Sequence, residues 1–442
     1  MDMKNFLLFI LFLFLESFLT MEAADKNKGD FSNLVVFLRF ADEDENVFEN
    51  TFSYYEKMFN NSEIGANSVY NYFKEASYNQ LFWFSVFYPK ASDSGRIISY
   101  QAKNNRAYYR KYSSINPEGY VDDAFGANKL SREQNLVKEL SDALADIVSP
   151  NEIIDADDNG IVDNLCIIVS GRSEIGNTHL LWPHRSTLYT KDGIIQGKKV
   201  NEYIMLFDDA NGFGPTMTPL KINTGVLCHE MSHTLGTYDL YHESVRTDLN
   251  PIGVWDLMSD NMEVPQQMSV YTKYKYCKWI DEIPQISVPG KYVLNPVGGT
   301  SNENIAYKIH PTGSDEYFIL EYRSTTNGTF DKNLPGSGLL IYRVNPYYTG
   351  NNAYDGNSKY DELYLFRPGG TTETDGRIEE AFFCQESGRT AFGGNAEYKP
   401  FYTNGEEAHF AIGNVSSCGE TIEFELFPFA SRIYLPQPEV SL

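Results

Sequence analysis

Residues 224–239 read TGVLCHEMSHTLGTYD, and this stretch decides how the chain is interpreted. On a helix, residues four positions apart lie on one face about 5–6 Å apart. The imidazoles of His229 and His233 can therefore bind one metal ion. Gly236 predicts the end of the helix, because glycine accepts the left-handed conformation at helix ends. Asp239 then follows in a position to return to the ion as a third ligand.

Glu230 stands beside the first histidine of this pattern. Two imidazoles, a carboxylate and an open fourth position are typical of catalytic zinc. A Glu next to a ligand is placed to act on a water molecule as a general base. The chain contains only seven histidines, so the extended pattern H-E-x-x-H-x-x-G-x-x-D is rarely met by chance. The alternative is an exposed helix with incidental histidines. We expect a zinc-dependent endopeptidase that hydrolyses proteins or peptides.

The extended motif resembles the metzincin pattern in its variant with Asp as third ligand. Residues 253–259, GVWDLMS, look like the Met-turn of the immune inhibitor A family of secreted metallopeptidases. Further stretches similar to that family lie between residues 33 and 345, and they are 69–78, 155–164, 181–184, 317–323 and 334–342. The resemblance implies a zincin-type catalytic domain, with a mixed sheet and an active-site helix. It also implies that Met258 forms a hydrophobic floor under the ligands.

Two features of the sequence depart from what the resemblance implies, one residue and one short segment. Some metzincins have a transition-state Tyr two residues after the Met-turn Met, but Asp260 occupies that place. Tyr238, Tyr241 and Tyr271 are alternative donors to a developing oxyanion, although packing is the simpler role for each. Family members often carry a propeptide, and only about ten residues separate the expected cleavage site from the first expected strand.

Two further histidines are candidates for the site. His242 lies three residues beyond Asp239 and is a rival third ligand, but Asp239 has the spacing from Gly236 that the motif requires. His184 follows Trp-Pro and either lines the cleft or has a structural role, which is favoured.

Residues 155–163 read DADDNGIVD and have the spacing of a calcium loop. Oxygen ligands at alternate positions and a Gly at the tight turn begin such loops. The expected ligands are the side chains of Asp155, Asp157, Asn159 and Asp163 and the carbonyl of Ile161. Cys166 stands where an EF-hand has its bidentate Glu, and a strand is expected to follow. We expect a structural calcium ion, the alternative being an Asp/Asn-rich turn that binds nothing.

The N-terminus and the charge indicate where the protein acts. Lys4, the apolar block 6–15 and the small pair Ala23-Ala24 have the order of a secretory signal peptide over residues 1–23. The block is short for a membrane anchor, which is the alternative. A net charge of −24 disfavours nucleic acid or an anionic membrane as partner. We therefore expect a secreted protein without stable membrane insertion.

Short-range patterns predict an α+β fold. Buried strands are expected at 33–40, 81–88 and 165–169, and helices at 68–76, from the Ser131/Gln134 capping box to about residue 150, and around the metal motif. After residue 286, short β runs alternate with turn residues and predict a β-sandwich. The expected division is a signal peptide over 1–23, a peptidase domain over 24–286, a β-sandwich-like domain over 287–430 and a tail over 431–442.

The late β region leaves other functions open. Its aromatic residues could form a carbohydrate platform, although a core role is favoured. The chain could then be a surface adhesin or glycan-binding protein with the zincin domain as scaffold, or a calcium-stabilised structural protein. The presence of Glu230 speaks against both. Of the five cysteines, Cys384 and Cys418 are the expected pair, while Cys166 and Cys228 are expected to be buried and inert.

Overall fold

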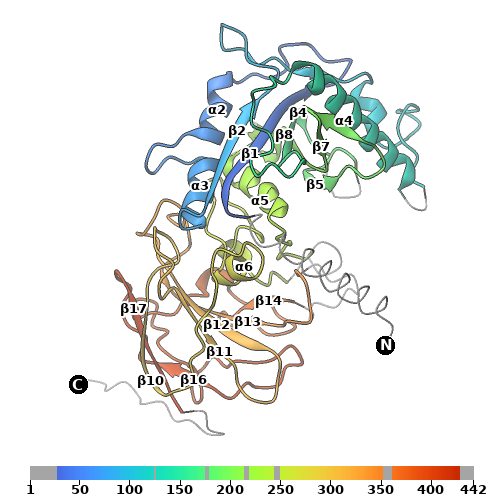
Figure 1. Cartoon of the computed structure of the whole chain (residues 1–442). Coiled ribbons are helices and arrows are strands. Elements are labelled where there is room, and N and C mark those ends of the chain that lie inside the picture. The colour runs from blue at the N-terminus through green and yellow to red at the C-terminus, as the bar shows by residue number, and fades with distance from the viewer. Residues whose placement is uncertain are drawn as a thin grey trace, which may run out of the picture.

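The fold is taken from a computed structural model, which describes residues 27–123, 126–174, 179–213, 219–242, 249–351 and 361–428. The expected signal peptide (1–23) and tail (431–442) lie outside the described residues. Figure 1 shows an α/β region and a β-rich region, with helices α5 (Thr224–Thr234) and α6 (Val270–Lys275) between them. This mixed architecture, with a β-rich C-terminal region, is the one expected.

The α/β region is built on one mixed sheet. Its central order is β2-β1-β4-β8-β5, with parallel pairing throughout except at the antiparallel edge strand β5. Short strands β3 and β9 pair with β1 and β8. The bounds are β1 Gly29–Arg39, β2 Leu81–Phe87, β3 Tyr100–Gln101, β4 Leu165–Arg172, β5 His184–Thr187, β8 Glu202–Phe213 and β9 Pro219–Lys221. The expected strands thus form three of the four parallel members.

Helices cover both faces of this sheet, as the continuous apolar strands require. In β1, Val35 and Phe37 face one core while Leu34, Val36 and Leu38 face the other. The first core also holds residues of α2 (Phe52–Asn60), α3 (Val69–Ala76) and α5, and the second holds those of α4 (Ala127–Ile147). A small hairpin of β6 (Gly193–Ile195) and β7 (Lys198–Val200) adds to the second core. The active-site helix therefore lies on the face opposite α4.

Helix α4 begins earlier than its sequence pattern predicts. Ser131 lies inside the helix, so the expected capping box is wrong. Gly126 is the N-cap, and the Asp123 carboxylate accepts hydrogen bonds from the backbone amides of residues 127 and 128. Gln134 is buried, and its side chain donates to the Thr187 carbonyl at the end of β5. The polar residues that suggested a cap belong instead to the helix interior and a tertiary contact.

Helix α5 forms and ends as its residues predict. Its N-cap Asn223 accepts a hydrogen bond from the Val226 amide at 3.0 Å. Gly225 is required by packing, because a Cβ there would meet the Met262 carbonyl oxygen at 1.7 Å. Gly236 has a φ of +89°, so it turns the chain out of the helix and toward Asp239 as expected.

The C-terminal region consists of two antiparallel sheets, each with four strands among the described residues. Their orders are β11-β12-β13-β14 and β10-β17-β16-β15. The two sheets share one core that includes Phe318, Phe410 and Phe424. The bounds are β10 Gly290–Leu294, β11 Ala306–Ile309, β12 Tyr317–Arg323, β13 Gly338–Val344, β14 Leu363–Leu365, β15 Phe392–Gly393, β16 Ala411–Gly413 and β17 Ile422–Leu426. The aromatic residues of this core are buried, as the packing role predicted.

The sheet β11–β14 also packs against the α/β region. Alternate residues of β12 point to opposite sides, so Phe318 enters the core between the two sheets while Ile319 enters the core around α5. Across this contact Arg323 is fully buried, and its guanidinium donates to the carbonyls of Trp255 and Gln267. The β-rich region therefore helps to hold the segment that follows the metal motif.

All five cysteines are free thiols. Cys166 and Cys228 are buried, as expected. Cys384 and Cys418 do lie side by side, with ligand atoms of both and of Glu386 within 4.8 Å of one another, but the expected disulfide is not formed. No helix among the described residues is long and apolar enough to cross a membrane.

Candidate active site

The three expected zinc ligands converge. The Asp239 Oδ1 atom lies 3.1 Å from His229 Nε2 and 3.4 Å from His233 Nε2. One ligand atom from each residue lies within 4.8 Å of the others. His229 is buried, while His233 and Asp239 are partly buried beside the cleft. Two imidazole nitrogens and a carboxylate oxygen at this separation are a donor set that fits zinc, with one side left open for a further ligand.

Backbone carbonyls orient both imidazoles. His229 Nδ1 donates to the Leu257 carbonyl at 2.9 Å, and His233 Nδ1 donates to the Thr237 carbonyl at 2.9 Å. A carbonyl oxygen only accepts, so these contacts place the proton of each neutral ring on Nδ1. The Nε2 lone pairs are then left for a cation. Outer hydrogen bonds of this kind are typical of metal-binding histidines.

Met258 lies directly behind the ligand loop. Its side chain is fully buried, and its sulfur accepts a hydrogen bond from the Thr237 hydroxyl at 3.5 Å. Its carbonyl accepts from the Leu240 amide at 2.8 Å. Asp256, also fully buried, accepts from the Met258 amide and so fixes the turn. The turn around Met258 therefore supports the segment on both sides of Asp239.

The charges of the cluster favour a cation. Burial by itself lowers the pKa of His229, but the hydrogen bond to Asp239 and the charges of Glu230 and Asp239 outweigh it and raise that pKa to about 9. Burial raises the pKa of Asp239, yet its two histidine partners hold it well below the usual range. Without a metal, the cluster thus keeps a proton where a divalent ion would bind.

The rival residues point elsewhere. His242 Nε2 pairs with the buried Asp361 carboxylate at 2.6 Å, toward the β-rich region. Tyr271 is buried and donates to Glu362 at 2.6 Å, so it has a packing role. Tyr238 and Tyr241 both line the cleft, and the ring of Tyr241 stacks at 6.3 Å from that of His229. Of the three candidate tyrosines, Tyr238 and Tyr241 are therefore the two that lie at the cleft.

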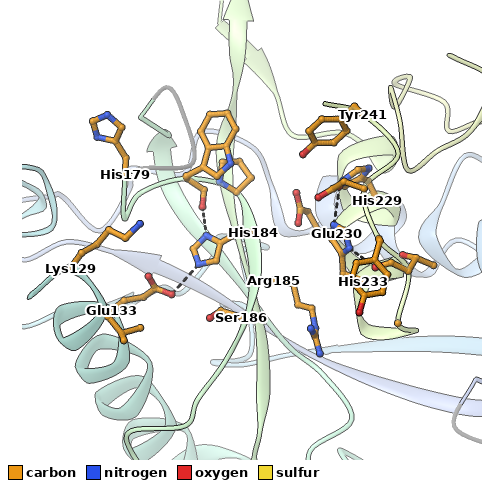
Figure 2. A pocket seen from close by; sticks show the side chains of 17 residues that line it. Lys129, Glu133, His179, His184, Arg185, Ser186, His229, Glu230, His233 and Tyr241 are labelled. Carbon is orange, nitrogen blue, oxygen red and sulfur yellow. Dashed lines mark hydrogen bonds and ion pairs between the residues drawn. The ribbon is translucent and has the colours of Figure 1, made fainter. Parts of the chain in front are cut away.

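The cluster opens into a cleft of about 560 Å³, a volume in the range of small-molecule and peptide sites. Figure 2 shows its two walls. His229, Glu230, His233 and Tyr241 form one wall. The opposite wall comes from α4, the chain before β5 and the first residue of β5, and it carries Lys129, Glu133, His179 and His184. Glu230 is 9 % exposed and belongs to the wall that holds the ligands.

Glu133, which is buried, and His184, which is partly exposed, form a pair on the far wall. His184 donates from Nε2 to Glu133 at 2.9 Å and from Nδ1 to the Trp182 carbonyl at 2.5 Å, and Tyr203 also donates to Glu133. Both acceptors lack protons to give, so His184 is an imidazolium. Burial lowers the pKa of His184, but the Glu133 carboxylate outweighs it and raises that pKa. His184 thus lines the cleft and is held structurally at once.

Sequence reasoning missed Glu133, although a signal was present. This residue lies on the same helical stripe as Leu136, Val137 and Leu140, all buried in the second core. A carboxylate in an apolar stripe requires a partner. The pattern does not show that the partner comes from β5, because the two elements are far apart in sequence.

The expected calcium loop brings its three aspartates together. Ligand oxygens of Asp155, Asp157 and Asp163 lie within 4.8 Å of one another. Burial, with the charges of Asp157 and Asp155, raises the pKa of Asp163 to about 6. The Asn159 side chain donates to Asp157 at 2.8 Å, and its amide oxygen accepts from the Ile161 amide at 2.8 Å, so Asn159 is held within the loop.

Lys198 reaches this loop from the β6–β7 hairpin. Its ammonium lies 2.7 Å from Asp155 and 2.8 Å from Asp158. Asp155 also accepts from the amides of Asn159 and Gly160. Ile161 is part of the loop and pairs with Lys199 in an isolated bridge. The loop therefore has both crowded carboxylates and a cation that already offsets part of their charge.

Two imidazoles, a carboxylate and an adjacent Glu at the edge of a cleft are the arrangement typical of a metallopeptidase. Residues 33–266 match the immune inhibitor A peptidase M6 catalytic domain, and because the match covers just over half of the chain, the protein belongs to that family. It is 25% identical to the pre-pro-metalloprotease PrtV of two Vibrio cholerae O1 strains over 226 residues, which are 47% of this chain and 24% of PrtV. The chain thus spans about a quarter of the length of these relatives.

Among solved structures, wild-type OgpA from Akkermansia muciniphila is similar over 76% of this chain and 79% of its own. The sequence identity is 14% and the TM-score is 0.27, a similarity too low to bear on the fold.

Proposed function

We propose that the protein is a secreted zinc-dependent endopeptidase whose metal is held by His229, His233 and Asp239. The observation that carries the proposal is the convergence of three ligand atoms within 4.8 Å, next to Glu230 and at the edge of a cleft. The proposed fold is of the zincin type, with a peptidase domain over 24–286 and a β-sandwich-like domain over 287–430. Secretion rests on the signal-peptide pattern of residues 1–23.

Glu230 is the proposed general base. When bound, zinc supplies Lewis acidity that polarises the scissile carbonyl and eases ionisation of water. Glu230 follows His229 on α5 and lines the cleft, so its carboxylate can take a proton from the attacking water. It then gives this proton to the leaving amine, which would otherwise depart as an unstable anion.

The free edge of strand β5 is the proposed binding place for a peptide substrate. Its partner is β8 on one side, and all four of its residues are partly exposed. An extended peptide can add to such an edge through main-chain hydrogen bonds. Helix α5 packs near β5, so a peptide bound in this way would pass the ligand cluster.

Hydrolysis of an unfolded protein tests this function. We expect the purified chain to cleave a reduced, carboxymethylated protein at internal bonds, a zinc chelator to stop cleavage, and added zinc to restore it. Mass spectrometry of the products separates internal cleavage from trimming at the ends. If cleavage persisted after complete zinc removal, the metal would not be catalytic. If the zinc-loaded chain cleaved no member of a diverse peptide library, the alternative function of a surface adhesin or glycan-binding protein would be favoured.

We further propose a structural calcium ion at Asp155, Asp157 and Asp163, with Asn159 and the Ile161 carbonyl as additional ligands. The support is the crowding of three carboxylates, since like charges held this close raise the energy of the folded loop until a cation binds. The Asp163 carboxylate also receives the Ser32 amide at 2.9 Å, which connects the loop to β1. An ion here would stabilise the junction of β1 and β4 behind the site.

Calcium is therefore expected to raise the melting temperature of the folded chain at fixed zinc. Binding to the folded state adds about 2.7 kcal/mol at a hundredfold excess over Kd. Asp157→Asn should blunt this response. Asp158→Asn is the matched control, because Asp158 is 91% exposed and pairs with Lys198 outside the trio. Thermal unfolding across a calcium titration measures all three proteins. If calcium did not change the melting temperature of the wild type, the loop would be a turn that binds no calcium and is held by the ion pairs of Lys198.

A further inference from the structure

A small, partly enclosed cavity lies where the β-rich region meets the segment after Asp239. It measures about 10 Å³, which is room for one water molecule or one monatomic ion. Its walls come from β13, from β14 and the chain on both sides of it, and from two segments that follow Asp239. The lining residues that matter are Arg343, Arg367, His242 and Asp361.

Arg343 is the unusual member of this lining. Its side chain is only 2 % exposed, yet among the described residues it donates no hydrogen bond, and its Nε and one terminal nitrogen are buried without a partner. The nearest charge is Glu316, 3.5 Å from Nε. The guanidinium packs over the rings of Tyr364 at 4.9 Å and Phe401 at 5.5 Å. A buried guanidinium has five N–H donors, and leaving them unpaired is costly.

The neighbouring carboxylates are committed to other partners. Asp361 pairs with His242 at 2.6 Å. Glu316 accepts from the Thr403 amide and hydroxyl. Asp375 pairs with Arg367, whose other donors reach the carbonyls of residues 250, 251 and 365. Arg367 therefore has acceptors for its N–H donors, whereas Arg343 has buried N–H donors without an acceptor in the part of the chain that the structure describes.

We propose that this cavity binds a single monatomic anion, chloride in ordinary salt, through the N–H groups of Arg343. The cavity is too small for phosphate, sulfate or a carboxylate ligand, so the size of the cavity selects a halide. The anion would supply the acceptor that buried Arg343 lacks. Burial lowers the pKa of Arg343 even though Glu316 and Asp361 oppose this shift, and a bound anion would relieve that cost of burial.

The cavity lies close to the ligand loop. His242 in its wall is three residues from Asp239. Asn351, which follows β13, donates its amide to the Asp239 carbonyl at 2.9 Å and its side chain to the Leu240 carbonyl at 3.0 Å. Arg343 lies in β13, directly before the chain that leads to Asn351. An anion bound to Arg343 would hold this part of the chain in place and so stabilise the contact between the β-rich region and the segment that contains Asp239. Binding of an anion at this position does not require peptidase activity.

Thermal unfolding and a halide soak test the proposal. The full chain, with zinc held constant, is unfolded in rising chloride, with gluconate replacing chloride so that the ionic strength is fixed. We expect a rise in melting temperature of roughly 2–4 °C for the wild type. Bromide should replace chloride, and crystals soaked in bromide should show an anomalous peak at Arg343. Arg343→Met should remove the response, while Arg377→Met, at an exposed position of the same region, should keep it.

The soak uses the wild type, so it decides the question even if Arg343→Met does not fold. It also separates this site from a halide on the catalytic metal, because the two positions are distinct in the map. Equal melting curves in chloride and gluconate, with no anomalous peak in the cavity, would overturn the proposal and leave a water molecule as the occupant.

Discussion

Replacing Glu230 with Gln or Ala is expected to abolish peptide hydrolysis while zinc stays bound. Glu230 is next to His229 on α5, but it does not supply any of the three ligand atoms that lie within 4.8 Å of one another. Its loss removes the group that takes and returns the proton, and such groups contribute about 10²–10⁴-fold to rate. Because Gln has nearly the size of Glu, the cleft wall and the helix should keep their structure.

Turnover of an internally quenched peptide, zinc content and melting temperature should be measured on the same preparations. Glu263→Gln is the matched control, because Glu263 lies at the other end of α5, near its N-terminus, and outside the lining of the cleft. We expect the control to keep wild-type turnover. Near-native turnover of a zinc-loaded Glu230→Gln protein would show that another group is the base.

The convergence of His229, His233 and Asp239 was predictable because its determinants are local. Two residues four apart on a helix share a face, and a left-handed Gly two residues after the helix turns the chain back within one loop. Strands β1, β2 and β4 were predictable for a similar reason, since each contains a largely apolar run, whereas β5 and β8 were not predicted. In these cases the covalent order of the chain nearly fixes the geometry.

The remainder of the site depends on contacts between distant segments. Glu133 and His184 are 51 residues apart and meet because α4 and β5 pack beside the same strand, β8. The start of α4 shifted because Asp123, outside the helix, supplies the cap that Ser131 was expected to supply. Arg343 belongs to an apolar β run, and nothing in that run indicates a buried guanidinium without a partner. Periodicity shows which residues are buried, not which residues they meet.

Asp239 and His242 both follow Gly236, and the structure separates their roles. Asp239 lies within 3.4 Å of both imidazole Nε2 atoms, whereas His242 pairs with Asp361 at 2.6 Å. Asp239→Ala should therefore lower zinc affinity strongly. Loss of an outer partner of a ligand typically costs 10–100-fold in affinity, so removal of a ligand itself should cost more than about 100-fold. The zinc affinity of Asp239→Asn should lie between those of the wild type and Asp239→Ala, because an amide oxygen is a weaker ligand than a carboxylate oxygen.

His242→Ala should instead leave zinc bound and lower the stability of the fold. The change leaves the Asp361 carboxylate buried, at 4 % exposure, without its closest partner. An unpaired buried charge is costly, so the melting temperature should fall while the metal content stays near that of the wild type. Zinc content after dialysis against a competing chelator, measured beside thermal unfolding, distinguishes the two effects. If His242→Ala lost zinc and Asp239→Ala kept it, the third ligand would be His242, and the segment after Gly236 would have to turn over when the metal binds.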